Sequence, residues 1–349
     1  MGGDQPALGP MKLVTSLQET IWGGRRLREL AGKDLPADRL IGESWETAND
    51  SRIAEGPMAG ATLGEATHTL GERLLGARAI EVFGMRFPLL AKFIDAHQWL
   101  SVQAHPDDGY AADWEDGKLG KTESWYILDA EPGAQIIYGV KRPVNREEVR
   151  AAIEANALEA LLRSAEVSAG DVVFVPAGTI HAIGSGVALY ELQEYSDITY
   201  RLYDYGRLQA NGQPRELHID RGLDVMRCEP SRIVKATPLV GEQTASSVRR
   251  TLVACKYFVE DEYTFSGQVS SHVTPSSLHV VTVIEGSCAV RWPGGELSLA
   301  LGDTAVLPAG MGAYIFEGRG RVIRAYVPDA DDPTLEAWRK LQGSDDVSR

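Results

Sequence analysis

The 349-residue chain has few cysteines and no long hydrophobic segment. Its three cysteines, Cys228, Cys255 and Cys288, lie far apart and are odd in number. A disulfide framework needs paired cysteines, so these thiols fit a reducing compartment, and we expect a cytoplasmic protein. No apolar run reaches the roughly 20 residues that a membrane-spanning helix needs, and no charged-then-apolar signal opens the chain. The sequence therefore predicts neither a disulfide-rich secreted module nor a membrane segment.

Positive charge is also scarce. Lysine and arginine number 35 against 49 aspartates and glutamates, which gives a formal net charge of −14. Such a balance argues against general binding to nucleic acid or to an anionic membrane. An anionic ligand would have to find a local basic pocket. The length predicts roughly two domains, and the Gly- and Pro-rich residues 1–10 are expected to be disordered.

Strand-like segments carry side chains that metal ions prefer. Alternate residues of a strand point to the same face. In the first segment Ser101, Gln103 and His105 therefore share a face, and in the second Lys121 and Glu123 do. A single histidine is more often structural than a ligand. Here the order of the segments strengthens the case for a site.

A third segment completes this pattern. Residues 171–175 form a Gly-Asp-initiated apolar strand that ends in a Pro-Ala-Gly turn, and His181 follows three residues after the turn. Imidazole and carboxylate groups are the usual nitrogen and oxygen donors for zinc and related divalent ions. A histidine strand, a glutamate strand and a strand ending in Pro-x-Gly-x-x-His is the metal-binding succession of cupins, which are small jelly-roll domains.

Four segments together resemble one enzyme family. They are residues 101–107 (SVQAHPD), 120–126 (GKTESWY), 176–183 (PAGTIHAI) and 191–205 (ELQEYSDITYRLYDY). These segments are similar to signature segments of type I mannose-6-phosphate isomerases, and the similarity runs from about residue 22 to residue 218. It is nearest to the short bacterial branch, which lacks a large helical insert.

An internal repeat predicts a second jelly roll. Residues 170–178 (GDVVFVPAG) are echoed by residues 302–310 (GDTAVLPAG) in the same register. The position that matches His181 holds Ala313 in the second copy, and residues 275–278 (PSSL) stand where a glutamate ligand would be expected. We therefore expect the second copy to bind no metal.

The predicted fold is mainly β, with two cupin jelly rolls and a small helical insertion. The expected organisation is a disordered N-terminus at 1–10, a catalytic cupin domain at 11–230 with a helical insert at about 143–166, a metal-free cupin domain at 235–328, and a short C-terminal helix and tail at 329–349. Asn145, with Glu148 three residues later, is the expected N-cap of the inserted helix. Asp332-Pro333 is the expected start of the capped C-terminal helix.

The resemblance implies a metal-dependent aldose–ketose isomerase that interconverts mannose 6-phosphate and fructose 6-phosphate through an enediol or enediolate. The metal ligands it implies are Gln103, His105, Glu123 and His181, with Gln103 as a weak or peripheral member. One divalent ion is expected, and zinc is the family's expectation. The same donors would also accept iron, manganese, cobalt or nickel.

Other residues are matched to catalysis and substrate binding by the same resemblance. The catalytic candidates are Arg201, Glu191 and Lys121, and the substrate-binding candidates are Trp22, Glu46, Lys92 and Ser101. A permanently charged guanidinium suits stabilisation of an enediolate or binding of phosphate better than proton transfer. Glu191 or a water molecule at the metal is then the proton carrier. Lys92 could instead be a solvated surface charge, and Trp22 could serve packing alone.

Two rival functions remain open at this stage. A non-catalytic, sugar-phosphate-binding regulatory homologue would keep the fold but lose part of the set of site residues, which is intact here. A cupin metal–oxygen enzyme would usually carry His-x-His where this chain has Gln103-Ala104-His105. The expected partner is a small sugar phosphate, with no nucleic acid and no membrane, and the oligomeric state is left open.

Overall fold

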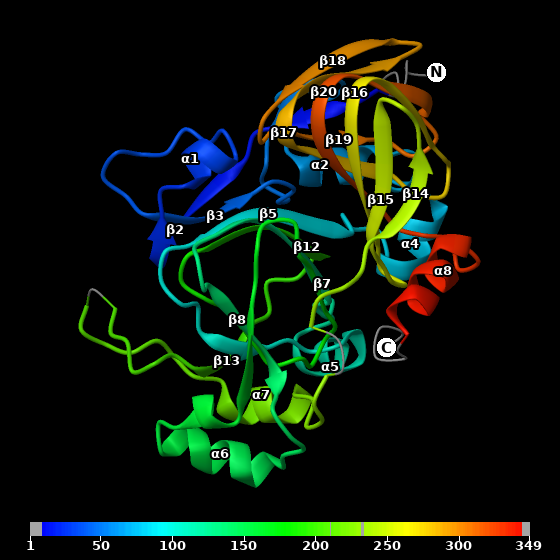
Figure 1. Cartoon of the computed structure of the whole chain (residues 1–349). Coiled ribbons are helices and arrows are strands. Elements are labelled where there is room, and N and C mark those ends of the chain that lie inside the picture. Colours follow the sequence, from blue (N-terminus) through cyan, green and yellow to red (C-terminus); the bar gives the residue numbers. More distant parts are fainter. Residues whose placement is uncertain (1–8, 210, 232–233, 344–349) are drawn as a thin grey trace.

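Two antiparallel sheets form the N-terminal jelly roll (Figure 1). The computed structural model describes residues 9–209, 211–231 and 234–343. Within that part of the chain, the first sheet has six strands in the order β10 (Val172–Val175), β7 (Glu123–Ala130), β12 (Val187–Glu194), β5 (Leu89–Ala96), β2 (Ser16–Gly24) and β3 (Ile41–Trp45). The second has five, in the order β13 (Tyr200–Tyr203), β6 (Val102–Ala104), β11 (His181–Ile183), β8 (Gln135–Val140) and β9 (Leu162–Glu166).

The inner faces of these two sheets enclose an apolar core. Trp125, Ile127, Ile136 and Leu189 are among its buried members. Every residue of β12 is buried, because one face of this strand covers the core and the other packs toward the C-terminal region. This double burial explains why β12 reads as a nearly continuous apolar run broken by a few functional side chains.

Helices cover the outer face of the five-stranded sheet. They are α6 (Arg146–Glu154), the 3₁₀ turn η1 (Leu158–Ala160) and α7 (Ile219–Val225), and they appear below β13 and β8 in Figure 1. As predicted, Asn145 caps α6: its Oδ1 accepts a hydrogen bond from Glu148 N at 2.8 Å. The helical insert predicted at about 143–166 extends too far, however. Residues 162–166 form β9, since their alternating burial suits a strand paired with β8.

The C-terminal region is built on a larger sheet. Within the described residues it has nine strands, including β14 (Leu239–Gln243), β15 (Ser247–Ala254), β16 (Val259–Val273), β17 (His279–Trp292), β18 (Gly295–Ala300), β19 (Thr304–Leu307) and β20 (Gly312–Tyr326). The other two strands, β1 (Met11–Leu13) and β4 (Ile53–Glu55), come from the start of the chain and extend the sheet beyond β19. The two regions therefore share main-chain hydrogen bonds as well as side-chain packing.

The predicted repeat is visible in the backbone. β10 and β19 are strands of the same length, and each leads into a Pro-Ala-Gly turn. The turn glycines, Gly178 and Gly310, have φ values of 82° and 70°, which side chains with a Cβ rarely adopt. The shared sequence thus records a shared strand-and-turn geometry.

The remaining helices lie mostly around the junction of the two regions. They are α1 (Leu27–Leu30), α2 (Leu63–Leu70), α3 (Glu72–Leu75), α4 (Ala77–Phe83), α5 (Asp108–Trp114) and α8 (Pro333–Gln342). The C-terminal helix α8 begins after Asp332, as expected, and buries Trp338 against β15. Among the described helices, none has the length and apolar character needed to cross a membrane.

The predicted disordered N-terminus falls mostly outside the described residues, which begin at residue 9. Gly9 and Pro10 are nevertheless buried, contrary to that expectation. A Cβ on Gly9 would lie 3.2 Å from the Trp292 ring, so this residue packs closely against the C-terminal sheet.

Candidate active site

The five-stranded sheet places three predicted site residues in one row. In the strand register, Gln103 of β6 lies opposite His181 of β11 on one side and opposite Arg201 of β13 on the other. Residues opposite each other in an antiparallel pair point to the same face. The short strand β6 therefore joins the metal-ligand candidate Gln103 to the catalytic candidate Arg201, which lies 98 positions later in the chain.

The six-stranded sheet supplies a facing row. Glu191 of β12 lies opposite Lys92 of β5 and Trp125 of β7, and two residues further along β12, Gln193 lies opposite Glu123. The two rows meet between the sheets, where most of these side chains are buried. Strand alternation and register together bring these side chains to one place between the sheets.

Three donor side chains converge at the centre. The ligand atoms of His105, Glu123 and His181 all lie within 4.8 Å of one another. Glu123 Oε1 is 3.3 Å from His181 Nε2, and Glu123 Oε2 is 3.6 Å from His105 Nε2. Gln103 Nε2 is 3.3 Å from His181 Nε2. All three donors of the central cluster are at most 1% exposed.

Backbone carbonyls orient both imidazoles. His105 Nδ1 donates to the carbonyl of Ile198, and His181 Nδ1 donates to that of Thr179, each at 2.8 Å. The Nε2 lone pairs are then left to point inward. Burial and the nearby Lys121 charge lower the pKa of His105 well below its usual value and that of His181 to about 4. Neutral imidazoles with inward lone pairs are the form that binds a metal ion.

Lys121 reaches into the same cluster. Its Nζ contacts Glu123 Oε2 and lies 3.1 Å from His105 Nε2. Burial and the charge of Glu191 raise the pKa of Glu123 above its usual value, against the opposing effect of Lys121. Glu123 Oε1 is buried and makes no hydrogen bond in the described structure. An unsatisfied buried carboxylate oxygen is costly, and a bound cation would satisfy it.

A cavity of about 350 Å³ opens above the cluster. It is lined by Glu19, Thr20, Ile21, Trp22, Glu43, Lys92, Ile94, Leu100, Ser101, Gln103, Lys121, Ile183, Glu191, Thr199, Arg201 and Arg215. Trp125 Nε1 donates to Glu191 Oε2 at 3.1 Å, and Lys92 Nζ lies 3.2 Å from Glu191 Oε1. Burial would lower the pKa of Lys92, but the charges of Glu43 and Glu191 outweigh it and raise that pKa.

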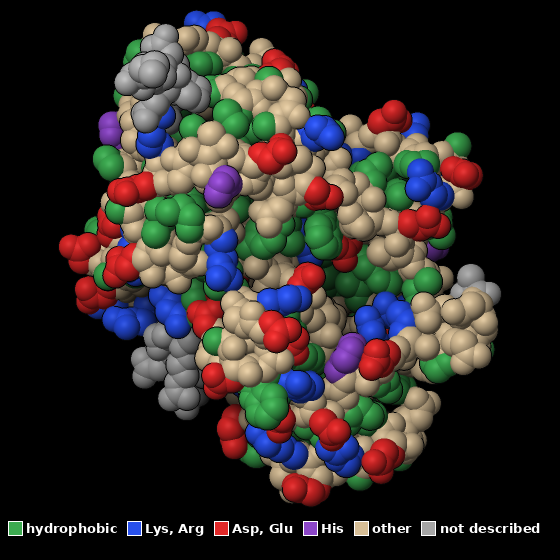
Figure 2. Space-filling view, turned by 180° about the vertical axis from the view of Figure 1, so that it is seen from behind, with side chains coloured by type: hydrophobic (Ala, Val, Ile, Leu, Met, Phe, Trp, Pro, Cys, Tyr) green, Lys and Arg blue, Asp and Glu red, His purple; other side chains and the backbone are tan. Residues whose placement is uncertain are grey.

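Arg201 presents its charge to this cavity. Its Nε donates to Ser101 Oγ at 3.3 Å and its Nη1 donates to the Glu216 carbonyl at 2.8 Å. In the described part of the chain it forms no ion pair with a carboxylate, whereas the neighbouring Arg215 is paired with Asp204. On the face in Figure 2, Lys and Arg side chains are interspersed with Asp and Glu. The positive charge at Arg201 is therefore a local feature of the cavity.

Known proteins match this chain over most of its length. The family model described as the catalytic domain of type I phosphomannose isomerase matches residues 11–129, and the cupin domain of mannose-6-phosphate isomerase matches residues 249–327. A mannose-6-phosphate isomerase, ManA, from Bacillus subtilis is 38% identical over 91% of this chain and 99% of its own length. The chain belongs to the type I phosphomannose isomerase family. The resemblance predicted from four segments is confirmed.

Further relatives of this phosphomannose isomerase family agree. A mannose-6-phosphate isomerase from Streptococcus mutans is 36% identical over 91% of this chain and 98% of its own length. The crystal structure of the mannose 6-phosphate isomerase from Bacillus subtilis superposes with a TM-score of 0.81 at 34% identity, covering 92% of this chain and 99% of that one. A mutant phosphomannose isomerase from Salmonella typhimurium shares the fold, with a TM-score of 0.73 at 20% identity over 92% of this chain and all of that one.

Most residues predicted for the phosphomannose isomerase site lie together. The cavity is lined by Trp22, Lys92, Ser101, Gln103, Lys121, Glu191 and Arg201, and the three central donors lie beside it. Glu46 lies elsewhere. It is fully buried beneath β3, where its carboxylate accepts hydrogen bonds from Lys33 Nζ at 2.9 Å and Ser44 Oγ at 2.7 Å.

Strand alternation explains this difference and identifies a residue that the prediction overlooked. Glu43 lies on the cavity face of β3, and Glu46, three residues later, falls on the opposite side. Trp125 could also have been predicted as a site residue, because it lies two residues after Glu123 on β7 and therefore points to the same face. Arg215 gave no comparable signal, since it comes from an irregular segment whose path the sequence does not reveal.

Proposed function

We propose that the chain interconverts mannose 6-phosphate and fructose 6-phosphate with the help of one divalent metal ion. The observation that carries the proposal is the buried His105–Glu123–His181 cluster beside a cavity with basic side chains. The names and catalytic family of its relatives support the substrate and the reaction.

The donor set fits a metal ion. Both imidazoles are held with Nε2 facing inward, and Glu123 Oε1 has no hydrogen-bond partner among the described residues. Two nitrogen donors and a carboxylate suit zinc, so we propose Zn²⁺ held by His105, Glu123 and His181, with Gln103 as an additional neutral ligand. When bound, such an ion supplies Lewis-acid stabilisation of negative charge on the sugar oxygens.

Glu191 is the proposed proton carrier between C1 and C2 of the sugar. Burial alone would raise its pKa, but Lys121 and Lys92 outweigh this effect and lower it. The side chain is then a carboxylate at neutral pH, ready to accept a proton. The Trp125 indole fixes one carboxylate oxygen, so the other is oriented toward the two lysines. Lys121, beside the donor cluster, is positioned to donate a proton to a sugar oxygen.

Arg201 is the proposed anchor for negative charge. Its guanidinium has no carboxylate partner within the described residues, and Ser101 holds its Nε. This arrangement suits either the enediolate or the phosphate group of the substrate. The role that we propose for Lys92 is not phosphate binding. Its ion pair with Glu191 keeps that carboxylate ionised. Trp22 lines the cavity and shapes it for the sugar.

We infer a cytoplasmic location for this activity. All three cysteines are free, and two of them are buried. Free buried thiols fit a reducing compartment, which is also where sugar phosphates are metabolised.

A coupled assay tests the function directly. Full-length protein is stripped of metal, reloaded with zinc and incubated with mannose 6-phosphate or with unphosphorylated mannose. We expect fructose 6-phosphate to form from the phosphate ester, with mannose turned over at least about 100-fold more slowly, because one well-placed guanidinium–phosphate contact contributes a few kcal/mol. Equal turnover of both sugars would contradict the role of Arg201 in phosphate recognition, and absence of turnover would contradict the function itself.

A further inference from the structure

The C-terminal jelly roll reaches the catalytic region through Tyr257. This residue lies in the turn between β15 and β16, and its hydroxyl donates to Asp108 Oδ2 at 2.8 Å. Tyr257 is 5% exposed, and burial raises the pKa of its hydroxyl far above the usual value. The hydroxyl therefore stays a donor at any working pH. A buried tyrosine hydroxyl needs a partner, and here the partner belongs to the other jelly roll.

Asp108 in turn holds the segment that carries Lys121. Its Oδ1 accepts a hydrogen bond from Gly120 N at 2.9 Å. Gly120 lies so close to this support that a Cβ would come within 2.6 Å of backbone atoms of Asp107 and Asp108. Lys121 N then donates to the carbonyl of Pro106 at 3.0 Å, directly after the ligand candidate His105. The Asp108 carboxylate and this backbone bond together tie the segment before Glu123 to the segment after His105.

A second acid, the buried Glu194, holds the far side of Lys121. Glu194 Oε1 accepts from Thr122 N at 2.8 Å, and Glu194 N donates to the Thr122 carbonyl at 3.1 Å. Burial and the neighbouring Asp108 raise the pKa of Glu194 well above its usual value. The amides on either side of Lys121 are therefore each held by a carboxyl group, that of the half-buried Asp108 and that of the buried Glu194.

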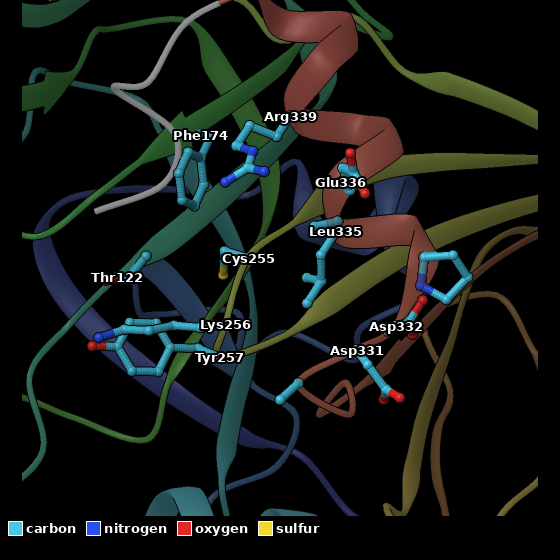
Figure 3. A pocket seen from close by; sticks show the side chains of 13 residues that line it. Thr122, Phe174, Cys255, Lys256, Tyr257, Asp331, Asp332, Leu335, Glu336 and Arg339 are labelled. Carbon is cyan, nitrogen blue, oxygen red and sulfur yellow. The ribbon is translucent and has the colours of Figure 1, made fainter.

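Packing beneath this segment is incomplete. Thr122 and Tyr257 line a cavity of about 390 Å³ that extends to α8, and Figure 3 shows them with Cys255, Leu335 and Arg339 around it. The same two residues also line a second cavity of about 520 Å³. Close packing normally fixes a buried segment in place. Where cavities replace it, hydrogen bonds must do more of the positioning.

We propose that Tyr257 is a positioning residue, which acts through Asp108 to hold residues 120–122 so that Lys121 and Glu123 keep their places in the site. The C-terminal jelly roll would then contribute to catalysis without touching substrate. This inference rests on the proposed function, because it assigns Tyr257 to the same site. Displacing a catalytic group by about 1 Å can cost up to 100-fold in rate, and loss of supporting contacts around a metal site typically costs 10- to 100-fold.

The test compares Tyr257→Phe with a matched control, Tyr326→Phe. Tyr326 lies in the same jelly roll and donates a hydrogen bond to Asp332 Oδ2 at 3.0 Å, at the N-cap of α8. In the zinc-loaded full chain we expect Tyr257→Phe to lower kcat by roughly 10-fold with KM within about twofold. Chelator competition without substrate should show severalfold weaker zinc binding. The control should match the unaltered protein in both measurements.

Asp108→Asn provides an independent route to the same contact. It should reproduce the kcat loss, and combining it with Tyr257→Phe should add little, because both changes break one chain of contacts. If Tyr257→Phe only lowers Tm while kcat and zinc affinity equal those of the control, the residue is merely structural and the proposal is wrong. An unaltered protein without isomerase activity would instead contradict the proposed function, while the zinc measurements would still decide the role of Tyr257.

Discussion

The two jelly rolls share a turn sequence but differ in what fills them. After the shared Pro-Ala-Gly turn, the N-terminal copy continues to His181, which is fully buried in the donor cluster. The corresponding Ala313 is exposed, and the following residue, Tyr314, packs inside against Phe316. The interior of the second copy is an apolar cluster around such rings. The repeated sequence therefore specifies the same course of the backbone in both copies. The side chains that point inward determine whether the interior of a copy is a ligand-binding site or an apolar core.

One arginine in each jelly roll shows the same contrast. Arg201 faces the cavity without a carboxylate partner in the described structure, held by Ser101 and a backbone carbonyl. Arg324 is 6% exposed, contacts Asp261 and Ser271, and lies over the rings of Tyr263 and Tyr326. The charge of Arg201 is therefore left available beside the cavity, where a ligand is expected. The charge of Arg324 is instead neutralised within the packed interior of the protein.

The largest expected effect comes from removing a buried histidine in each jelly roll. His181→Ala should abolish tight metal binding and reduce activity at least about 1000-fold, because it removes one of three central donors. His279→Ala is the control: it removes a buried histidine whose Nδ1 lies 3.1 Å from the Tyr314 hydroxyl. The control should lower Tm yet leave zinc content and activity of the folded protein unchanged. Zinc retained by His181→Ala, measured by elemental analysis, would contradict the assignment.

A smaller effect is expected from the arginine pair. Arg201→Lys should lower kcat/KM by roughly 10- to 100-fold, equivalent to about 1.4–2.7 kcal/mol, because lysine keeps the charge but loses the planar fork. Its zinc content and unfolding free energy should hardly change. Arg324→Lys should do the reverse, lowering the unfolding free energy by about 1–3 kcal/mol with little change in kcat/KM. Loss of zinc in Arg201→Lys would mean that β13 contributes to the metal site itself.

Local patterns in the sequence predicted much of the candidate site. Alternation along two strand-like segments indicated Gln103, His105 and Glu123 as inward-facing, and the turn before His181 indicated where that donor would lie. The same rule also separates Glu43 from Glu46, so the misplacement of Glu46 was avoidable. The N-cap at Asn145 and the start of α8 were likewise readable, because caps depend on neighbours only a few residues away.

Features that depend on distant contacts could not be predicted in this way. β1 pairs with β19, whose partner residues lie almost 300 positions later. The hydrogen bond from Tyr257 to Asp108 joins residues 149 positions apart. A β-bulge between Arg201 and Tyr203 interrupts the alternation along β13 and turns Tyr203 into the core beside α7. Such contacts arise from tertiary packing, for which a single sequence has no local signal.

Buried glutamates extend the comparison to pH. Glu123 in the N-terminal jelly roll lies beside Lys121 and two imidazoles. Glu260, on β16 of the C-terminal jelly roll, has one oxygen bonded to Ser124 Oγ and the other without a hydrogen bond in the described structure. Burial, with smaller effects of Asp261 and Glu262, raises the pKa of Glu260 from 4.5 to about 8. Among the described residues no lysine or arginine pairs with this carboxyl group, so it is expected to be neutral in the folded protein.

Glu260 should therefore make the protein less stable as pH rises between about 4.5 and 8. In that window the unfolded chain has released the proton and the folded chain retains it, so this group lowers the unfolding free energy by up to about 1.4 kcal/mol per pH unit. Glu260→Gln cannot ionise and should lack this component, which makes it more stable than the unaltered protein at pH 8 and similar at pH 4.5. Denaturant unfolding at pH 5, 6.5 and 8 measures the difference, with exposed Glu296→Gln as the control. If the unaltered protein and Glu260→Gln lose stability in parallel across these pH values, Glu260 is ionised in the folded state, and the second jelly roll tolerates a buried charge as well as the first.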